Sequence, residues 1–178
     1  ALVTDLLDVT RLQAGVLAVA TAPTYPGDVI LPALDELGLG PAQVELDVEA
    51  PPVPLLADPG LLQRVLVNLL SNAVRHSGGA PVRIATSTLG ELGQIRVIDR
   101  GPGIPADRRA DVFLPFQRLG DTDNTTGLGL GLALSSGFVE GMGGTLEVED
   151  TPGGGVTMVV GLAVVTAAPP GEPGEGAA

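Results

Sequence analysis

Hydrophobic residues recur along this chain with two different spacings, one typical of helices and one typical of strands. Apolar residues three to four positions apart predict amphipathic helices at 1–14, 27–37 and 61–77, and a fourth helix is expected at about 129–141. Gly15 supplies a stop for the first helix. Because that helix opens the chain without a capping residue, we expect it to continue upstream in a longer protein, although a plain packing helix would show the same stripe.

Capping residues indicate where the later helices begin and end. Asp58 and Pro59 form a favourable N-cap and first-turn pair for the long helix, which is expected to stop at Gly78. The helix at 27–37 contains Pro32, which has no backbone N–H to donate. We therefore expect Pro32 to lie in the first turn of that helix or to break it.

Alternating apolar and polar residues predict the strands, which are expected at 43–48, 82–88, 93–99, 144–150 and 155–164. The last two form a hairpin, and the segment 51–58 is expected to pair with the strand at 43–48. This order of elements predicts one two-layer α/β sandwich. In it, a mixed β-sheet of about five strands is covered on one face by three helices.

Two segments follow no periodic pattern. Between Asp99 and Gly131 the chain is rich in Gly, Thr and Asp, apart from a short helix expected near 107–112. A loop of this length inside a compact domain is usually functional. The last residues, 167–178, have the composition of a disordered tail.

Composition supports one globular domain and excludes some classes of partner. The 178 residues are 44% hydrophobic and 17% charged, with 26 glycines and 16 prolines that imply many turns. The net charge is −12, from 21 acidic residues against nine arginines and no lysine, so the chain should repel nucleic acid. The same charge opposes a polyphosphate, so a nucleotide site would need a metal ion, backbone amides and a few placed arginines.

Cysteine content and hydropathy bear on the compartment. The chain has no cysteine, which excludes disulfides and thiolate metal sites and favours a reducing interior. No apolar run approaches the roughly 20 residues needed to cross a bilayer, and the N-terminus lacks the basic start of a signal peptide. We therefore expect a soluble cytoplasmic piece.

Two groups of polar residues suggest a binding site. Asn68 and Asn72 project from one face of the long helix, and a carboxamide oxygen is a suitable ligand for Mg²⁺. Asp99 ends an apolar strand and precedes Gly101 and Gly103. A carboxylate there can accept the amino group of adenine, while the glycines let the backbone approach a flat ring. Taken alone, the asparagines more often form a solvated face, and the aspartate more often an Asp-Gly turn.

Two further groups lie in or beside the unpatterned stretch. Phe113 and Phe116 concentrate two of the three phenylalanines beside a polar loop, which suggests an anchor for it, although such residues more often belong to a core. Gly127, Gly129 and Gly131 open the last helix, where exposed amides and the helix dipole suit a phosphate. Glycines at this spacing can equally form a hinge or a tight helix–sheet contact.

In this order and spacing, the four groups resemble the N, G1, F and G2 boxes of the catalytic domain of sensor histidine kinases, whose wider family includes gyrase, Hsp90 and MutL ATPases. The resemblance covers about residues 27–165, and 116–155 look most like the Kdp-type potassium sensor kinases. It implies that 1–15 end a dimerisation and phosphoacceptor helix. Residues 16–166 would then form the ATP-binding catalytic domain, and 167–178 a tail.

The resemblance also implies roles for individual residues. Asn72 would hold Mg²⁺ against the phosphates of ATP, and Asp99 would bind the adenine amino group. The base pocket would be shaped by Gly101, Gly103 and Ile104. A short lid at 119–126, expected to be mobile in an empty site, would be hinged by Gly127, Gly129 and Gly131, which would face the triphosphate. Leu128 and Leu130, between these glycines, would also belong to the nucleotide-binding residues.

Three other residues are assigned supporting roles in this way. Arg75 and Arg118 could neutralise part of the negative charge of the phosphates. Thr157 would support Asp99 through a hydrogen bond or a water molecule. The lone histidine, His76, lacks the helical context and following acidic residue of a phosphoacceptor. We therefore expect it to have a structural or pocket-edge role.

Asn68 bears on the reaction. In the hydrolytic relatives this position carries a glutamate that activates water, whereas a carboxamide is not a useful general base. The resemblance therefore implies phosphate transfer rather than ATP hydrolysis, with Asn68, Asn72 and Arg75 as the catalytic group. Catalysis would consist mainly of positioning and neutralising the γ-phosphoryl group.

The function expected from the resemblance is donation of the ATP γ-phosphate to a histidine upstream of this chain, for relay to the receiver domain of a response regulator. The parent protein would be a homodimeric, membrane-anchored sensor of potassium or osmotic stress, with this domain in the cytoplasm. Two alternatives stay open: a regulatory module that no longer binds nucleotide, and a serine kinase of the anti-sigma type.

Overall fold

A computed structural model describes residues 2–115 and 129–166, and all structural statements concern these two ranges. The elements in chain order are α1 (Leu2–Gln13), β1 (Ala22–Thr24), α2 (Pro26–Leu37), β2 (Val44–Asp47), β3 (Leu55–Ala57), α3 (Pro59–His76), β4 (Val82–Leu89), β5 (Leu92–Ile98), α4 (Gly131–Gly141), β6 (Thr145–Asp150) and β7 (Val156–Ala163). Two short 3₁₀ turns, Ala106–Arg108 and Asp111–Phe113, replace the single helix expected near 107–112.

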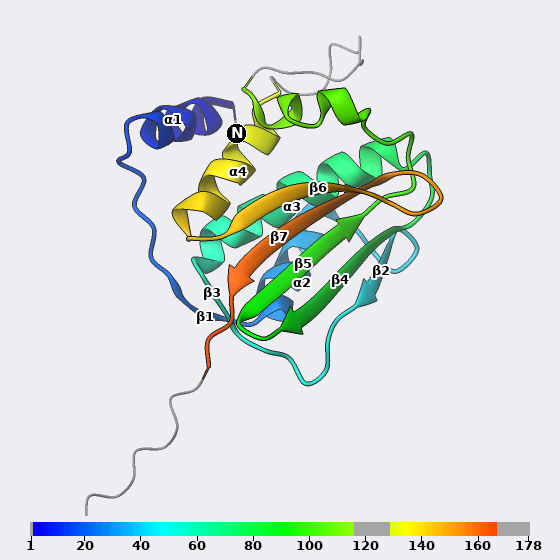
Figure 1. The fold of residues 1–178 in the computed structure, drawn as a ribbon, viewed down its shortest axis with the longest axis horizontal. Coiled ribbons are helices and arrows are strands. Elements are labelled where there is room, and N and C mark those ends of the chain that lie inside the picture. The colour runs from blue at the N-terminus through cyan, green and yellow to red at the C-terminus, as the bar shows by residue number, and fades with distance from the viewer. Residues whose placement is uncertain (1, 116–128, 167–178) are drawn as a thin grey trace, which may run out of the picture.

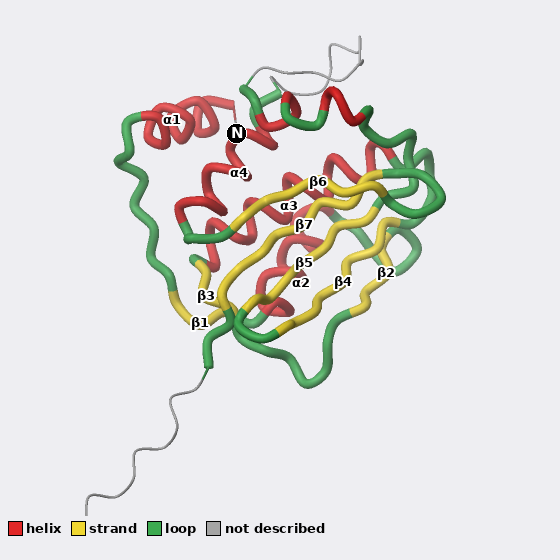
Figure 2. Tube along the Cα trace, viewed as in Figure 1, coloured by secondary structure: helices red, strands yellow, loops and turns green. Residues whose placement is uncertain are grey.

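The main sheet has five strands in the order β2-β4-β5-β7-β6, and α2, α3 and α4 lie behind it in Figures 1 and 2. β2 and β4 are parallel, while the other neighbours are antiparallel. The predicted two-layer α/β sandwich with a mixed sheet is therefore confirmed. Within the described ranges, no helix is both long and apolar enough to cross a membrane.

The core forms where α3 crosses the sheet. Every apolar residue on one face of α3 is buried, as its helical spacing predicts: Leu62, Val65, Leu66, Leu69, Leu70 and Ala73. They pack against the sheet residues Ile84 and Val97, which lie opposite each other on β4 and β5.

The predicted N-cap of α3 is also confirmed. The Asp58 side chain accepts a 3.1 Å hydrogen bond from the Leu61 N–H. The start of this helix is therefore fixed by its own sequence.

The expectation for Pro32 was wrong. Pro32 lies in the middle of α2, beyond its first turn, and the helix continues to Leu37. The side chain of Pro32 is exposed, while Ile30 and Ala33 beside it are buried against the core. Packing of the apolar face therefore outweighs the lost backbone hydrogen bond.

Replacing Pro32 with alanine should raise the free energy of unfolding by about 1–2 kcal/mol. An interior proline costs a helix about 3 kcal/mol, partly offset because proline also restricts the unfolded chain. Pro26 is the matched control, since it occupies the first turn of the same helix and is buried. Urea unfolding followed by circular dichroism should show stabilisation for Pro32→Ala only, and equal effects of the two substitutions would contradict this account.

The expected partner of β2 was also wrong. β3 pairs antiparallel with β1 in a separate two-stranded sheet, whereas β2 pairs with β4. The connection from β2 to β3 contains three prolines between residues 51 and 54 and does not form the tight hairpin turn that pairing would require. The α3 crossover instead brings β4 alongside β2 in parallel.

Helix α1 lies beside α4 in Figure 1, and its residues Asp5 and Asp8 form ion pairs with Arg64 of α3. The Asp8 carboxylate is 2.7 Å from the Arg64 guanidinium of α3 and is 4% exposed as a residue. The same guanidinium lies 4.8 Å from the centre of the Phe138 ring of α4. Leu12 fills the space beside Gly137, where a Cβ atom would be 2.6 Å from its side chain.

Asp8→Ala should loosen α1 without unfolding the sandwich. The ion pair is worth about 1 kcal/mol after allowance for the partial exposure of Arg64, which corresponds to roughly five-fold faster opening. Hydrogen exchange of the α1 amides measures this opening. Asp5→Ala is the control, because Asp5 is farther from Arg64, at 3.4 Å, and more exposed. Faster exchange in the control than in Asp8→Ala would contradict the assignment.

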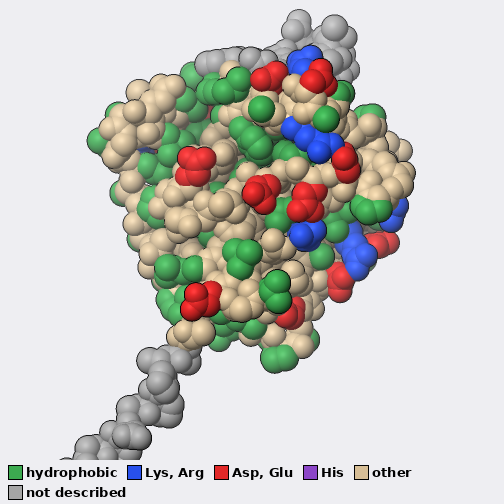
Figure 3. All heavy atoms as spheres, viewed as in Figure 1, with side chains coloured by type: hydrophobic (Ala, Val, Ile, Leu, Met, Phe, Trp, Pro, Cys, Tyr) green, Lys and Arg blue, Asp and Glu red, His purple; other side chains and the backbone are tan. Residues whose placement is uncertain are grey.

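The face of the sheet away from the helices carries polar and charged side chains. Figure 3 shows acidic and basic groups interspersed on this side. Arg96 of β5 pairs with Glu149 of β6 at 3.0 Å, and Arg83 of β4 pairs with Asp47 of β2. Apart from the buried centre of β7, this face is open to solvent, and the predicted site residues lie on the helix side and at the strand ends.

Candidate functional site

Asp99 is held rigidly where β5 ends. Asp99 is only 6% exposed to solvent. Its Oδ1 atom accepts hydrogen bonds from the N–H groups of Gly101, at 2.9 Å, and Val156, at 3.1 Å. Its own N–H donates to the Val156 carbonyl at 2.9 Å. Within the described ranges Oδ2 has no hydrogen-bond partner, so one carboxylate oxygen is fixed and the other can accept a donor from a ligand.

Two glycines let the backbone close around Asp99. A Cβ atom at Gly101 would lie 2.1 Å from the His76 carbonyl oxygen at the end of α3. Gly155 has φ +114°, and a Cβ there would lie 2.0 Å from the carbonyl oxygen of Asp99 itself. Only glycine fits either place, and together they bring the end of α3, the segment after β5 and the β6–β7 turn into contact.

Thr157 does not support Asp99 directly. It lies opposite Ile98, one position before Asp99, so its side chain belongs to the other face of the sheet. Its hydroxyl is 3.0 Å from that of Thr151, and both threonines are buried. The expected direct hydrogen bond from Thr157 to Asp99 is therefore not formed, and the backbone N–H of Val156 donates to Asp99 instead.

The second part of the site lies where α3 meets the start of α4. The Asn68 Nδ2 group donates to the Gly131 carbonyl at 3.3 Å and to the Ser135 hydroxyl at 3.2 Å. Leu130, at the N-cap of α4, offers no side-chain cap. The first N–H groups of α4 have no partner within the helix and can therefore bind an anion.

The remaining predicted residues on α3 lie between these two parts. Asn72 is half-buried one turn after Asn68, whereas Arg75 and His76 are exposed in the last turn. Asn68 and His76 are eight residues apart, roughly 12 Å along the helix axis. The arrangement can hold an elongated ligand. One end of the ligand would donate a hydrogen bond to Asp99, and its other end, near Gly131, would be negatively charged.

Other predicted residues divide into those the structure describes and those it does not. Leu130 is buried, while Ile104 and Gly103 are half-buried in the segment after Asp99, and a Cβ at Gly103 would be 3.5 Å from the Gly155 carbonyl. Gly129 is described, with φ 71°. The residues that lie outside the described ranges are Phe116, Arg118, the expected lid at 119–126, Gly127 and Leu128.

Arg109 connects the 3₁₀ turns to the sheet through an ion pair with Asp150 at the end of β6. Arg109 therefore makes a structural contact.

Within residues 2–115 and 129–166, no group of three or more histidine, aspartate or glutamate side chains could hold a metal ion. A metal ion at this site would therefore depend on carboxamide, water and ligand oxygens.

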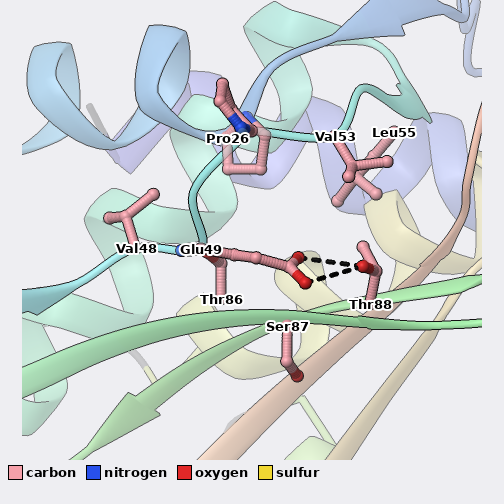
Figure 4. A pocket seen from close by; sticks show the side chains of 9 residues that line it. Pro26, Val48, Glu49, Val53, Leu55, Thr86, Ser87 and Thr88 are labelled. Carbon is pink, nitrogen blue, oxygen red and sulfur yellow. Dashed lines mark hydrogen bonds between the residues drawn. The ribbon is translucent and has the colours of Figure 1, made fainter.

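A small pocket elsewhere in the fold is not part of this site. It lies between the start of α2, the segment after β2, and β4, where Figure 4 shows Glu49 reaching the Thr88 hydroxyl with both carboxylate oxygens, each at 2.9 Å. Its volume is about 10 Å³, room for roughly one water molecule. Thr88 pairs with Gly93, at the opposite end of β5 from Asp99.

Three residues of the site were missed from sequence. Gly155 belongs to a run of three glycines in the β6–β7 turn, a signal that could have indicated a close backbone contact. Val156 contributes only its backbone N–H, so its side chain gave no signal. Ser135 is an ordinary polar residue within a helical pattern, and only the packing of α4 on α3 reveals its contact with Asn68.

Comparison with known proteins agrees with this geometry. Residues 57–166 match the model of the histidine kinase-, DNA gyrase B- and HSP90-like ATPase family. The sensor protein KdpD of Rathayibacter rathayi is 66% identical over 166 residues, and that of Mycobacterium tuberculosis H37Rv is 44% identical over 171. These alignments cover 93% and 92% of the chain. The chain spans only 19% and 20% of those two relatives.

Solved structures of sensor kinases share the fold. Full-length ShkA, in complex with AMPPNP, superposes with a TM-score of 0.79 and 30% identity, over 94% of this chain and 36% of that one. The mycobacterial sensor histidine kinase MprB superposes with a TM-score of 0.69 and 28% identity, over 82% of this chain and 98% of that one. The chain therefore belongs to the histidine kinase-, DNA gyrase B- and HSP90-like ATPase family, as an ATP-binding catalytic domain of the two-component sensor kinase type.

Proposed function

We propose that this domain binds ATP between α3, the start of α4 and the segment after β5, and donates the γ-phosphate to a histidine upstream of the chain. The observation that carries the proposal is the orientation of Asp99. With Oδ1 held by two backbone N–H groups, Oδ2 is presented as an acceptor for the adenine amino group. Guanine carries an oxygen at the corresponding position and would be repelled.

The residues around α3 and α4 suit the other end of the nucleotide. The uncapped first turn of α4 offers N–H groups and a positive dipole end to the phosphates. Arg75 is exposed in the last turn of α3 and adds positive charge to an otherwise acidic domain. We also propose that Arg118 contributes positive charge to the phosphate end and that residues 119–126 form a lid over the site.

Mg²⁺ is proposed to bind at Asn72. This carboxamide is half-buried one helical turn beyond Asn68, and it lies between the adenine end and the phosphate end of the site. When bound, the ion would neutralise the phosphates and orient the transferred group. Asn72 would supply one oxygen ligand, and phosphate and water oxygens would supply the rest.

Asn68 supports phosphate transfer over hydrolysis. Its side-chain N–H groups are both directed at α4, and a carboxamide cannot take a proton from water. The domain would therefore hold ATP until an incoming nucleophile reaches the γ-phosphate. The residues of this chain bind, orient and neutralise, and the histidine that is phosphorylated comes from elsewhere in the parent protein.

The parent protein is proposed to be a Kdp-type sensor kinase, because the two KdpD relatives match more than nine-tenths of this chain. It would be a membrane-anchored homodimer that responds to potassium or osmotic stress, with this domain in the cytoplasm. α1 would be the end of the dimerisation and phosphoacceptor helix. The receiver domain of a response regulator would take the phosphate from the histidine, and 167–178 would be a tail.

Phosphate transfer is tested on a chain extended upstream to include the candidate phosphoacceptor histidine. Incubation with ATP labelled at the γ-phosphate should give an acid-labile, base-stable label on that histidine, which is lost in Asp99→Asn and in a variant without the histidine. Release of free phosphate without labelled protein would instead favour an ATPase. Label on serine would favour a serine kinase, and absence of nucleotide binding would favour a regulatory module.

A further inference from the structure

Asn68 has a defined orientation in this structure. Its Nδ2 group is 3.3 Å from the Gly131 carbonyl oxygen and 3.2 Å from the Ser135 hydroxyl. A backbone carbonyl can only accept a hydrogen bond, so the nitrogen of the carboxamide, not its oxygen, has to face α4. Both amide hydrogens of Asn68 are therefore used to hold α4 against α3.

The two partners of Asn68 lie one turn apart on α4, at the end that faces the proposed phosphates. Gly131 is the first residue of α4, and its carbonyl lies in the first turn of the helix. Ser135 is fully buried, and within the described ranges Asn68 is the hydrogen-bond partner of its hydroxyl. Burying a hydroxyl is costly without such a partner, so Ser135 is suited to this contact.

This contact fixes the start of α4 in an unusual way. A helix is commonly held at its N-terminus by a side chain that accepts from the first N–H groups, but such a cap would occupy the groups that bind an anion. Leu130, at the N-cap position, provides no such bond. Asn68 instead holds the first turn through a carbonyl oxygen, which leaves the N–H groups open.

We propose that Asn68 and Ser135 are positioning residues that hold the first turn of α4 in register with α3, so that its N–H groups meet the phosphates of the nucleotide. The proposal rests on the proposed nucleotide site and deepens it. It assigns Asn68 to the architecture of the phosphate end, rather than to the metal ion or to proton transfer. It also adds Ser135, which does not face the ligand, to the residues that determine phosphate affinity.

The experiment compares two ligands that differ only in the phosphates. ADP with Mg²⁺ and adenosine are titrated into the 178-residue chain, with ADP followed by calorimetry and adenosine by NMR shifts. The variants are Ser135→Ala, Asn68→Ala and the double variant, and Asn68→Asp serves as a near-isosteric replacement that lacks both amide hydrogens. Ser136→Ala is the matched control, because Ser136 is the next residue of α4 and bonds only Glu140, at 3.4 Å, within the described ranges.

Loss of one or two hydrogen bonds of this kind should weaken ADP binding roughly 3- to 10-fold. We expect this change for Ser135→Ala and for Asn68→Ala, with the double variant no weaker than the weaker single variant. Asn68→Asp should be at least as weak, because its carboxylate would face the Gly131 carbonyl. Adenosine affinity should stay within about two-fold in every variant, as should ADP affinity in Ser136→Ala.

Either of two binding results would overturn the proposal. If Asn68→Ala loses ADP binding while Ser135→Ala keeps it, Asn68 contacts the ligand or its metal directly. If the affinities for ADP and for adenosine fall equally, the contact is part of the general fold.

If the unaltered chain binds neither ligand, the proposed function fails, and the contact is tested separately by hydrogen exchange of the Asn68 side-chain amide. Protection lost in Ser135→Ala supports the contact, and absence of protection in the unaltered chain contradicts it.

Discussion

Gly155→Ala should lower the free energy of unfolding by about 4 kcal/mol. Part of this cost, about 2 kcal/mol, comes from forcing a residue with a Cβ atom to adopt a positive φ, here +114°. The remainder comes from overlap, because the new Cβ would lie 2.0 Å from the Asp99 carbonyl oxygen and 2.8 Å from the Arg100 Cα. Both obstacles are backbone atoms, which cannot turn aside as a flexible side chain can.

Gly154→Ala separates these two effects. Gly154 has nearly the same φ, +109°, but the nearest atom to its Cβ would be the Gly101 carbonyl oxygen at 3.9 Å. It should therefore cost only the conformational part, about 2 kcal/mol. Chemical unfolding of the two variants measures the difference. Equal destabilisation would mean that the close contact between Gly155 and Asp99 does not exist.

Asp99→Asn should weaken ADP binding roughly 100-fold, near the upper end for a charge-assisted hydrogen bond. The two backbone N–H groups that hold Oδ1 can only donate, so the asparagine oxygen should occupy that place. The new NH₂ group would then stand where Oδ2 stands and would oppose the adenine amino group. It would instead favour the oxygen of guanine.

The measurement is calorimetric titration of Asp99→Asn with ADP and with GDP. The variant should lose affinity for ADP and gain relative affinity for GDP, while its melting temperature stays close to that of the unaltered chain. Unchanged ADP affinity would remove Asp99 from the site. Equal loss for both nucleotides, with a lowered melting temperature, would indicate damage to the fold.

The sequence predicted most of the fold because the strong elements carry their own signals. α3 combines an apolar face with Asp58 as its cap and two glycines after its end, so local preference and packing agree. β2 lacks such agreement: its pairing depends on the α3 crossover, and proximity in sequence wrongly suggested β3 as its partner. Pro32 was misjudged for a related reason, since tertiary packing outweighs its helix-breaking tendency.

The residues of the candidate site carry a signal in the sequence, whereas most of the contacts among them do not. The order of Asn68, Asn72, Asp99 and the glycine-rich segment indicated a nucleotide site through a family resemblance. It could not reveal that Asn68 donates to Gly131, because that contact joins segments 63 residues apart. Backbone contributions, such as the N–H of Val156, leave no mark on side-chain chemistry.

The central claim is that this chain binds adenine nucleotides through Asp99, and the most direct test is titration of the unaltered 178-residue chain with ADP and with GDP, both with Mg²⁺. The account predicts one ADP per chain, bound at least roughly ten-fold more tightly than GDP, as one discriminating hydrogen bond allows. Failure to bind ADP at millimolar concentration in a folded protein, or equal affinity for GDP, would contradict it.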